Sequence, residues 1–375
     1  MKKVGICLSD YIRPGKSIGI IGGGSLGFLL ALQAKAMGFV VNVLDPVADC
    51  PASKVCDQMF IADYNSLIEI ERLSRVSDVL TYTTNELNVD TLSSIQRELN
   101  LPQGIDILAL SQDALMEKGF LEDHGINVAP YATIVRITDV EENIDGIGYP
   151  CLLRQTRGDR QLVIEGASDI IEAMDLVKNS TCILETMISS AKTYSLSVAR
   201  NAKEEMTFFP IVETIYDYEG LKETTTVVDL DSDLMGELER IATVIAESLN
   251  LYGVLTVEYS ITEDGAIYVH HMVPFPEERL FYSLEACEIS GFEAHLRGIC
   301  NWPLMDYSRL LSNALTRIVL GHDLSEAKRQ VPHQAHWHFH FYDRNDAFAN
   351  TIVGHITILT SDIEEARLEI EKIMA

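Results

Sequence analysis

The stretch that decides the fold is Lys16-Ser17-Ile18-Gly19-Ile20-Ile21-Gly22-Gly23-Gly24-Ser25-Leu26-Gly27. A short apolar run of strand type leads directly into a glycine-rich turn. Helical apolar spacing follows from Leu26 to Met37, and a second β-rich run, Phe39 to Leu44, ends at Asp45-Pro46. The order of strand, glycine turn, helix and strand predicts one βαβ unit with parallel strands.

The glycines of this turn follow the spacing G-x-G-x-x-G at Gly22, Gly24 and Gly27. Bare backbone can approach an anion there, and the N-terminus of the following helix adds partial positive charge. Asp45, at the end of the second strand, is placed to bind a ribose hydroxyl. The motif leaves three explanations open: a dinucleotide such as a nicotinamide cofactor, another phosphate ligand, or tight packing of helix on sheet.

The pattern of strands and helices continues along the whole chain. Strand-like runs at 58–62 and 76–81 extend the first region to about residue 110 and predict a small doubly wound domain. The strands expected in the second region are 149–155, 161–165, 181–185, 194–199, 253–261 and 266–272. Helices are expected at 112–125, 169–177 and 232–249. The last region has strands at 315–320, 336–342 and 354–359 and a helix at 363–373.

Composition restricts the possible functions. The chain has 375 residues, enough for two or three domains, and a formal net charge of −27, which argues against binding nucleic acid. Any anionic ligand therefore needs a local positive patch. The seven cysteines are scattered without Cys-x-x-Cys spacing, which is typical of reduced thiols. There is no signal-peptide or membrane-span pattern, so we expect a cytoplasmic protein.

Short motifs in a definite order cover nearly the whole chain. They are Pro14 to Gly27, Met37-Gly38, Leu44-Asp45-Pro46, Asp78 to Tyr82, Leu101 to Gly104, Gln112-Asp113 with Glu117-Lys118, Gly148 to Pro150, Phe209-Pro210, Thr256 to Glu258, Tyr282 to Cys287, Trp337 to Tyr342 and Gly354-His355. In this order they resemble the N5-carboxyaminoimidazole ribonucleotide synthetases. These are ATP-grasp ligases of purine biosynthesis that carboxylate aminoimidazole ribonucleotide with ATP and bicarbonate.

The resemblance implies an α/β fold of three domains. These are a Rossmann-like N-terminal domain over 1–110, a central ATP-grasp domain over 111–300 and a small C-terminal β-rich domain over 301–375. It also implies a homodimer, small nucleotide ligands, and ATP with magnesium.

Carried over residue by residue, the resemblance supplies three groups of site residues. The substrate-binding candidates are Gly22, Gly23, Gly24, Ser25, Leu26, Tyr82 and Arg344. The ATP-binding candidates are Lys118, Arg154 and Glu185. The metal-binding candidates are Glu258 and His271.

Several ATP-site positions depart from the family pattern. Arg154 replaces a lysine, which keeps the charge but changes its geometry. Gly158-Asp159-Arg160 stands in place of a longer glycine-rich loop, and backbone N–H groups of such a non-glycine loop cannot easily reach phosphates. Ala114 replaces an arginine, and Thr193 lies near the position of a glutamate that holds the ribose of ATP.

The metal site departs in the same way. The family holds magnesium between two glutamates on adjacent strands; Glu258 matches the first, but the second has become His270-His271. Imidazole is a poor ligand for magnesium, so a zinc site with Glu258 and His271 is an alternative. Neighbouring strand residues face opposite ways, so His270 and His271 should not bind one ion together. In a further pattern, His336-x-His338-x-His340, alternate strand residues share a face, but the family has a similar His-x-His there without a metal.

On the substrate side, Glu277-Glu278 stands where the family has basic and hydrogen-bonding residues, and its charge would repel a sugar phosphate. Two hypotheses remain: a working, divergent synthetase, or a non-catalytic paralogue that binds or regulates. The substitutions fall on cations, glycines and metal ligands rather than on core positions, and this favours loss or change of the ancestral reaction.

Overall fold

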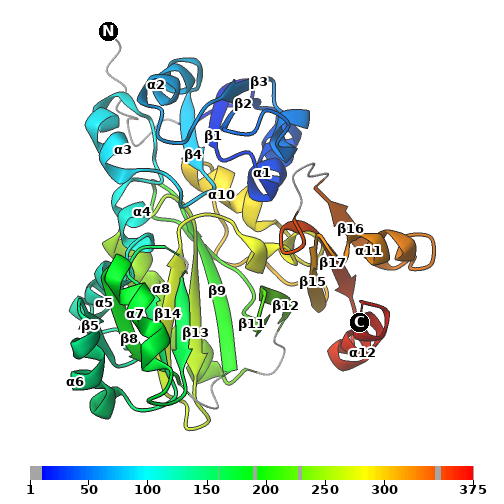
Figure 1. Cartoon of the computed structure of the whole chain (residues 1–375). Helices are drawn as coiled ribbons and strands as arrows, with labels where there is room; N and C mark the ends of the chain where they lie inside the picture. The colour runs from blue at the N-terminus through cyan, green and yellow to red at the C-terminus, as the bar shows by residue number, and fades with distance from the viewer. Residues whose placement is uncertain (1–10, 159, 189–191, 227–229, 343–347, 375) are drawn as a thin grey trace. The chain divides into compact units, whose positions relative to one another are not determined.

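The computed structural model describes residues 11–158, 160–188, 192–226, 230–342 and 348–374 (Figure 1). They form two compact units, each built from separate stretches of the chain. The first unit comprises Met1–Ile105, Ser195–Thr256 and Val273–Ala375, within the described ranges. The second comprises Asp106–Tyr194 and Val257–Met272.

The first unit opens with a parallel sheet of order β3-β2-β1-β4. Its strands are β1 (Ser17–Ile21), β2 (Val40–Asp45), β3 (Gln58–Ile61) and β4 (Val79–Tyr82). Helix α1 (Ser25–Ala36) connects β1 to β2, and helix α2 (Leu67–Val76) connects β3 to β4. The predicted βαβ unit and the doubly wound arrangement are confirmed.

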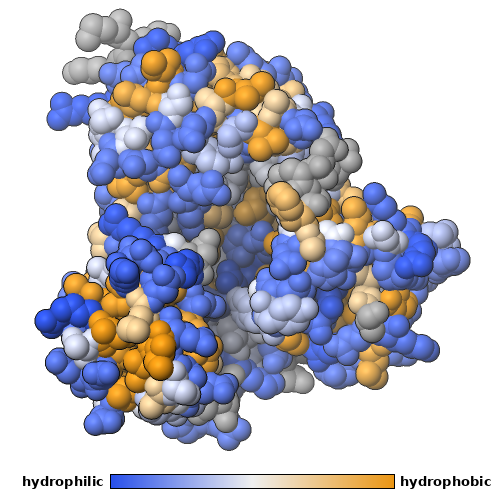
Figure 2. Space-filling model, in the orientation of Figure 1, coloured by the Kyte–Doolittle hydropathy of each residue, from blue (hydrophilic) through white to orange (hydrophobic). Residues whose placement is uncertain are grey.

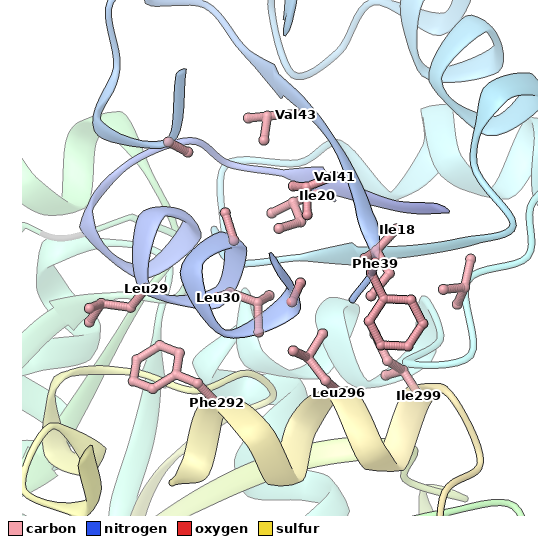
Figure 3. Packing of buried hydrophobic residues seen from close by; sticks show 14 of the residues in the cluster. Ile18, Ile20, Leu29, Leu30, Phe39, Val41, Val43, Phe292, Leu296 and Ile299 are labelled. Atoms are coloured by element: carbon pink, nitrogen blue, oxygen red, sulfur yellow. The ribbon is translucent and has the colours of Figure 1, made fainter. Parts of the chain in front are cut away.

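Helix α1 is held by a hydrophobic cluster that includes a helix far away in the sequence. Leu29 and Leu30 of α1 lie against Phe292 and Leu296 of helix α10 (Gly291–Ile299) (Figure 3). Each large apolar side chain buried in this way stabilises the fold by roughly 1.5–3 kcal/mol. The glycine turn before α1 is therefore fixed by a well-packed helix.

The larger sheet has the order β14-β13-β9-β11-β12-β15-β17-β16, with β10 paired to β9. Its strands are β9 (Lys192–Arg200), β10 (Met206–Phe208), β11 (Val212–Asp217), β12 (Gly220–Thr226), β13 (Gly253–Ile261), β14 (Ile267–Val273), β15 (Ala314–Leu320), β16 (Trp337–Phe341) and β17 (Ile352–Leu359). Strand β17 pairs antiparallel with both β15 and β16. The other helices of the first unit are α3 (Val89–Ile95), α8 (Ser232–Ser248), α9 (Ser283–Ala286), α11 (Leu324–Gln330) and α12 (Ile363–Met374).

The second unit contains an antiparallel sheet of order β5-β8-β6-β7. Its strands are β5 (Tyr131–Ile134), β6 (Cys151–Gln155), β7 (Gln161–Ile164) and β8 (Cys182–Thr186). Its helices are α4 (Asp106–Ser111), α5 (Ala114–Asp123), α6 (Ile137–Ile147) and α7 (Ile170–Asn179). Helices α6 and α7 share one apolar core with β6 and β8.

The surface shows one apolar region on the second unit, over α7 (Figure 2). Ile171 and Met174 of α7 are exposed there, as is Val163 of β7. Among the described residues, no helix has both the length and the hydropathy needed to cross a bilayer. The described cysteines are all unpaired thiols, as their scattered positions predict, and Cys7 lies outside the described residues.

Candidate functional site

The glycine turn joins β1 to α1, and three of its glycines are required by packing. Gly22 has a φ of +108°, which side-chain-bearing residues rarely adopt. A Cβ on Gly27 would lie 1.9 Å from the carbonyl oxygen of Gly22. A Cβ on Gly23 would lie 2.4 Å from Cys50 Sγ. These glycines let the backbone turn tightly against the sheet, with or without a ligand.

Asp45 belongs to the internal hydrogen bonding of this turn. Its Oδ2 accepts from the Gly23 N–H and the Tyr64 hydroxyl, both at 2.6 Å, and its Oδ1 accepts from the Val47 N–H at 2.8 Å. Burial and then this carboxylate raise the pKa of Tyr64 far above its usual range. Asp45 is buried and accepts from protein donors through both oxygens, which argues against a role as ribose ligand and weakens the dinucleotide alternative.

Gly24 differs from the other glycines of the turn. A Cβ at this position would have no heavy atom within 4 Å, so packing does not require a glycine there. Gly24 is also the N-cap of α1, and no side chain caps the helix. The N–H groups of the first turn, including those of Ser25 and Leu26, have no acceptor within the helix. This end of α1 offers backbone donors to an anion.

The other two predicted substrate ligands are placed differently. Tyr82 is fully buried in β4; its hydroxyl donates to the Gly104 carbonyl oxygen at 3.2 Å, and its ring packs edge-on against Phe275. It therefore supports the site from within the core rather than facing a ligand. Arg344 lies outside the described residues.

The three predicted ATP ligands meet in the second unit. Leu152 of β6 pairs with Glu185 of β8, so Arg154, two residues further along β6, shares a face with that carboxylate. Arg154 Nε donates to Glu185 Oε1 at 2.9 Å. Lys118 of α5 is almost completely buried, and its Nζ lies 2.8 Å from Glu185 Oε2 and 5.2 Å from the centre of the Tyr131 ring.

The charges of this cluster do not cancel. Burial alone would raise the pKa of Glu185, but the charges of Arg154 and Lys118 outweigh burial and leave the pKa below its usual value. One ionised carboxylate thus faces two cations. Among the described residues, the buried Arg154 Nη2 has no hydrogen-bond partner. Taken by themselves, Glu185, Lys118 and Arg154 carry one net positive charge, and the unused donor of Arg154 suits an anionic ligand.

The metal pair of Glu258 and His271 stays a prediction, but His271 has another carboxylate beside it. His271 Nδ1 lies 3.1 Å from Glu117 Oε2. His270 lies within electrostatic range of the Glu258 and Glu185 carboxylates, which raise its pKa, although burial lowers it more. Adjacent residues of β14 face opposite ways, and in this register His270 takes the place expected for His271.

Magnesium is a poor fit to the residues present. Glu258 is buried and supplies carboxylate oxygens, but its neighbour His270 is a neutral imidazole, and Glu185 is engaged by Lys118 and Arg154. Magnesium requires several oxygen ligands in near-ideal octahedral geometry. The described residues supply one suitable carboxylate, so no chemical step is assigned to a magnesium ion here.

The acidic pair of the substrate side is largely neutralised. Glu277 is buried, caps the short turn that follows it through the Arg279 N–H, and lies 3.1 Å from Arg279 Nη1. Burial and the nearby Glu277 raise the pKa of Glu278 to about 7. The expected repulsion of a sugar phosphate is therefore weaker than two exposed glutamates would produce.

Sequence reasoning did not single out Glu117, which orients this part of the second unit. Its carboxylate accepts the Met272 N–H at 2.6 Å and contacts His271. A signal was present: Ala114, Glu117, Lys118 and Leu121 have the i, i+3, i+4, i+7 spacing of a buried helix face. Charged residues at buried positions need partners. Lys118 has Glu185, and Glu117 has His271 and the Met272 N–H.

Two family models match successive parts of this chain. Residues 15–112 match the ribonucleotide synthetase preATP-grasp domain, and residues 119–292 match the ATP-grasp domain. The N5-carboxyaminoimidazole ribonucleotide synthase of Staphylococcus saprophyticus is 33% identical over 366 residues, which cover 96% of this chain and 97% of that protein. The synthase of Bacillus subtilis is 31% identical over 360 residues, covering 95% and 94%.

The crystal structure of N5-carboxyaminoimidazole synthetase from Staphylococcus aureus complexed with ADP has the same fold. It is 30% identical, with a TM-score of 0.94 over 98% of this chain and 99% of that one. Fold, motif order and full-length similarity agree, and the chain belongs to the N5-carboxyaminoimidazole ribonucleotide synthase family of purine biosynthesis.

Proposed function

We propose that this protein binds an adenine nucleotide in its second unit, with Lys118 and Arg154 holding the phosphates. The observation that carries this proposal is the pair of cations on one buried carboxylate, Glu185, with Arg154 Nη2 unused among the described residues. A related synthetase with 30% identity is known in complex with ADP. Charge-assisted hydrogen bonds from such nitrogens are the usual means of holding phosphate oxygens.

The second half of the proposal concerns the glycine turn of the first unit. Gly22, Gly23, Gly24, Ser25 and Leu26 form a phosphate cradle for the ribonucleotide substrate. Gly24 supports this because its Cα faces open space, and the start of α1 has no side-chain cap. The activity we propose is the family reaction, the carboxylation of aminoimidazole ribonucleotide with ATP and bicarbonate.

A non-catalytic binding role is the second candidate, and one observation favours it. His270 lies beside Glu258, where a magnesium–nucleotide complex would need a second carboxylate. Such a protein would still bind adenine nucleotide through Lys118 and Arg154. The two candidates therefore share a ligand and differ in turnover.

Nucleotide binding is tested by calorimetric titration of the purified chain with ADP. We expect micromolar affinity that falls at least tenfold in Lys118→Ala and in Arg154→Ala. Arg136→Ala serves as the control, because Arg136 is exposed in the same unit and forms a local ion pair with Asp139. Equal affinities in all four proteins, or no binding by the parent, would overturn the proposed nucleotide site.

Turnover is tested separately, by ADP release in the presence of ATP and bicarbonate, with and without aminoimidazole ribonucleotide. ADP release that depends on the ribonucleotide supports the ligase. Nucleotide binding without such release supports the non-catalytic candidate. The homodimer and the division into 1–110, 111–300 and 301–375 belong to the same proposal. Light scattering of the eluting protein tests the dimer: the mass of a single chain would contradict it.

A further inference from the structure

Three side chains of the first unit, outside both proposed ligand sites, form a cluster of metal-ligand type. They are Glu285 of α9, His340 of β16 and His355 of β17. His340 and His355 are directly paired across the two strands, and their rings stack with centroids 4.3 Å apart. One ligand atom from each of the three residues lies within 4.8 Å of the other two.

The cluster is hydrogen-bonded only in part. His340 Nε2 lies 2.7 Å from Glu285 Oε1, while the buried Glu285 Oε2 has no hydrogen-bond partner among the described residues. His355 is 0% exposed, and its Nδ1 lies 2.5 Å from the Tyr342 hydroxyl. His355 Nε2 likewise has no partner in the described part of the chain. A buried polar atom left unpaired is destabilising, so these two atoms call for a ligand.

The charge around the cluster points to a cation. Tyr342, which contacts His355, lies within electrostatic range of both Glu278 and Glu285. Arg279, the basic residue of this segment, is engaged by Glu277 and by the hydroxyl of Tyr216. Buried carboxyl groups are normally balanced by a cation or a metal ion.

We propose that Glu285, His340 and His355 bind a divalent transition-metal ion of the zinc type. Two imidazoles and one carboxylate are a ligand set that such ions accept, with further positions left for water. Tyr342 holds the second nitrogen of His355, the arrangement that orients a ligating imidazole. Ligand atoms of a tetrahedral zinc ion lie roughly 3.4 Å apart, so binding draws the three side chains together.

The proposed set is not the one that sequence spacing suggests. His336 and His338 are exposed, and of the His-x-His-x-His pattern only His340 joins the cluster. His355 of β17 meets His340 through the strand pairing, and Glu285 reaches it from α9. His338 is therefore a matched control, because it lies on the same strand and the same face two residues away.

The test uses the full chain, stripped with a chelator and then dialysed against Zn²⁺ or Co²⁺. We expect one metal equivalent per chain and, for Co²⁺, visible d–d absorption typical of nitrogen and oxygen ligands. His340→Ala and Glu285→Gln should each lower the metal affinity at least tenfold. His338→Ala should bind metal like the parent. Thermal unfolding with and without metal shows whether each variant is folded and whether Zn²⁺ stabilises it.

Two results would overturn the proposal. One is a parent chain that binds no more than a trace of metal, in which case ordered water satisfies His355 Nε2. The other is metal binding that His340→Ala and His338→Ala retain equally, in which case the ion lies elsewhere. The metal content of the parent and the metal affinity of the variants are both measured without nucleotide. Failure of this proposal can therefore be told apart from failure of the proposed function.

Discussion

At the scale of single residues, Glu185 sets the charge balance of the second unit's polar site. It is almost fully buried and contacts both Lys118 and Arg154. Removing one partner from such a buried group leaves the remaining charges without compensation. The protein is then less stable than it is with the intact cluster. The carboxylate thus supplies the counter-charge that makes burial of these two cations tolerable.

We therefore expect Glu185→Gln to lower the free energy of unfolding by about 3 kcal/mol, because two buried cations lose their counter-charge. Urea unfolding followed by circular dichroism measures this. Asp175→Asn is the control: Asp175 makes an exposed ion pair with Arg160 at 2.8 Å, and its loss should leave stability nearly unchanged. Similar losses in the two variants would contradict the buried charge balance.

The glycine turn provides a second pair of matched substitutions. Gly27→Ala places a methyl group 1.9 Å from the backbone oxygen of Gly22, so the turn must shift and stability should fall by at least about 2 kcal/mol. Gly24→Ala meets no atom within 4 Å and should leave stability nearly unchanged. If the turn holds a phosphate, Gly24→Ala should nevertheless weaken ribonucleotide binding, measured by calorimetry. A Gly24→Ala protein with unchanged affinity would favour the packing explanation of the motif.

At the scale of elements, β14 shows what periodicity can and cannot predict. Alternation along a strand correctly separates His270 from His271, but it does not say which of them faces Glu258. A shift of one residue exchanges the two faces, and the register of a strand is fixed by its tertiary partners. Here Glu117 on α5 holds the Met272 N–H and His271, so His270 faces the carboxylates.

This placement predicts opposite results for two neighbouring substitutions. His270→Glu puts a second carboxylate beside Glu258, so Mg²⁺ should raise the ADP affinity of this variant at least tenfold, against twofold or less in the parent. His271→Glu places a carboxylate beside Glu117 and should mainly destabilise the fold. Calorimetry with and without Mg²⁺ makes the comparison. A Mg²⁺ response in His271→Glu alone would show that the two faces are assigned the wrong way round.

Most strands and long helices were predictable because their apolar patterns are regular. The βαβ unit around α1 and the pairs β6/β7 and β16/β17 fall close to the expected ranges. Strands β5, β10, β11 and β12 were not expected: β10, for example, has three residues, and β12 reads GLKETTT without apolar alternation. Pairing with neighbouring strands, not local pattern, makes them strands. The site residues followed from family resemblance, but their contacts required the tertiary structure.

At the scale of the whole molecule, buried neutral histidines should make the fold sensitive to acid. His295 is fully buried; its Nδ1 accepts the Val254 N–H at 3.1 Å, which leaves the proton on Nε2, beside the Thr81 hydroxyl at 2.8 Å. Thr81 in turn donates to Gln103 at 2.8 Å. Burial lowers the pKa of His295 to about 3. This network ties α10 to β4 and β13 only while the imidazole is neutral.

In the unfolded chain this histidine has a pKa of roughly 6.5, so below that pH it binds a proton that the folded state does not bind. His295 therefore contributes its full stabilisation above pH 6.5, and the free energy of unfolding falls as the pH is lowered. Between pH 6.5 and 5 we expect this residue to cost up to about 2 kcal/mol. Urea unfolding at several pH values measures it. His295→Gln should be less stable at pH 7 but change less with pH. Parallel pH profiles for the two proteins would exclude His295 as the source.

The discontinuous make-up of the two units has a consequence for the order in which the protein is made. The second unit ends at Met272, whereas the first unit draws its last segment from Val273–Ala375. Strands β15, β16 and β17 leave the ribosome late, and the sheet around them cannot close before they do. The second unit is therefore complete while the first is still an open chain. During synthesis the second unit should fold first, and the first should close only after its last segment, Val273–Ala375, has been made.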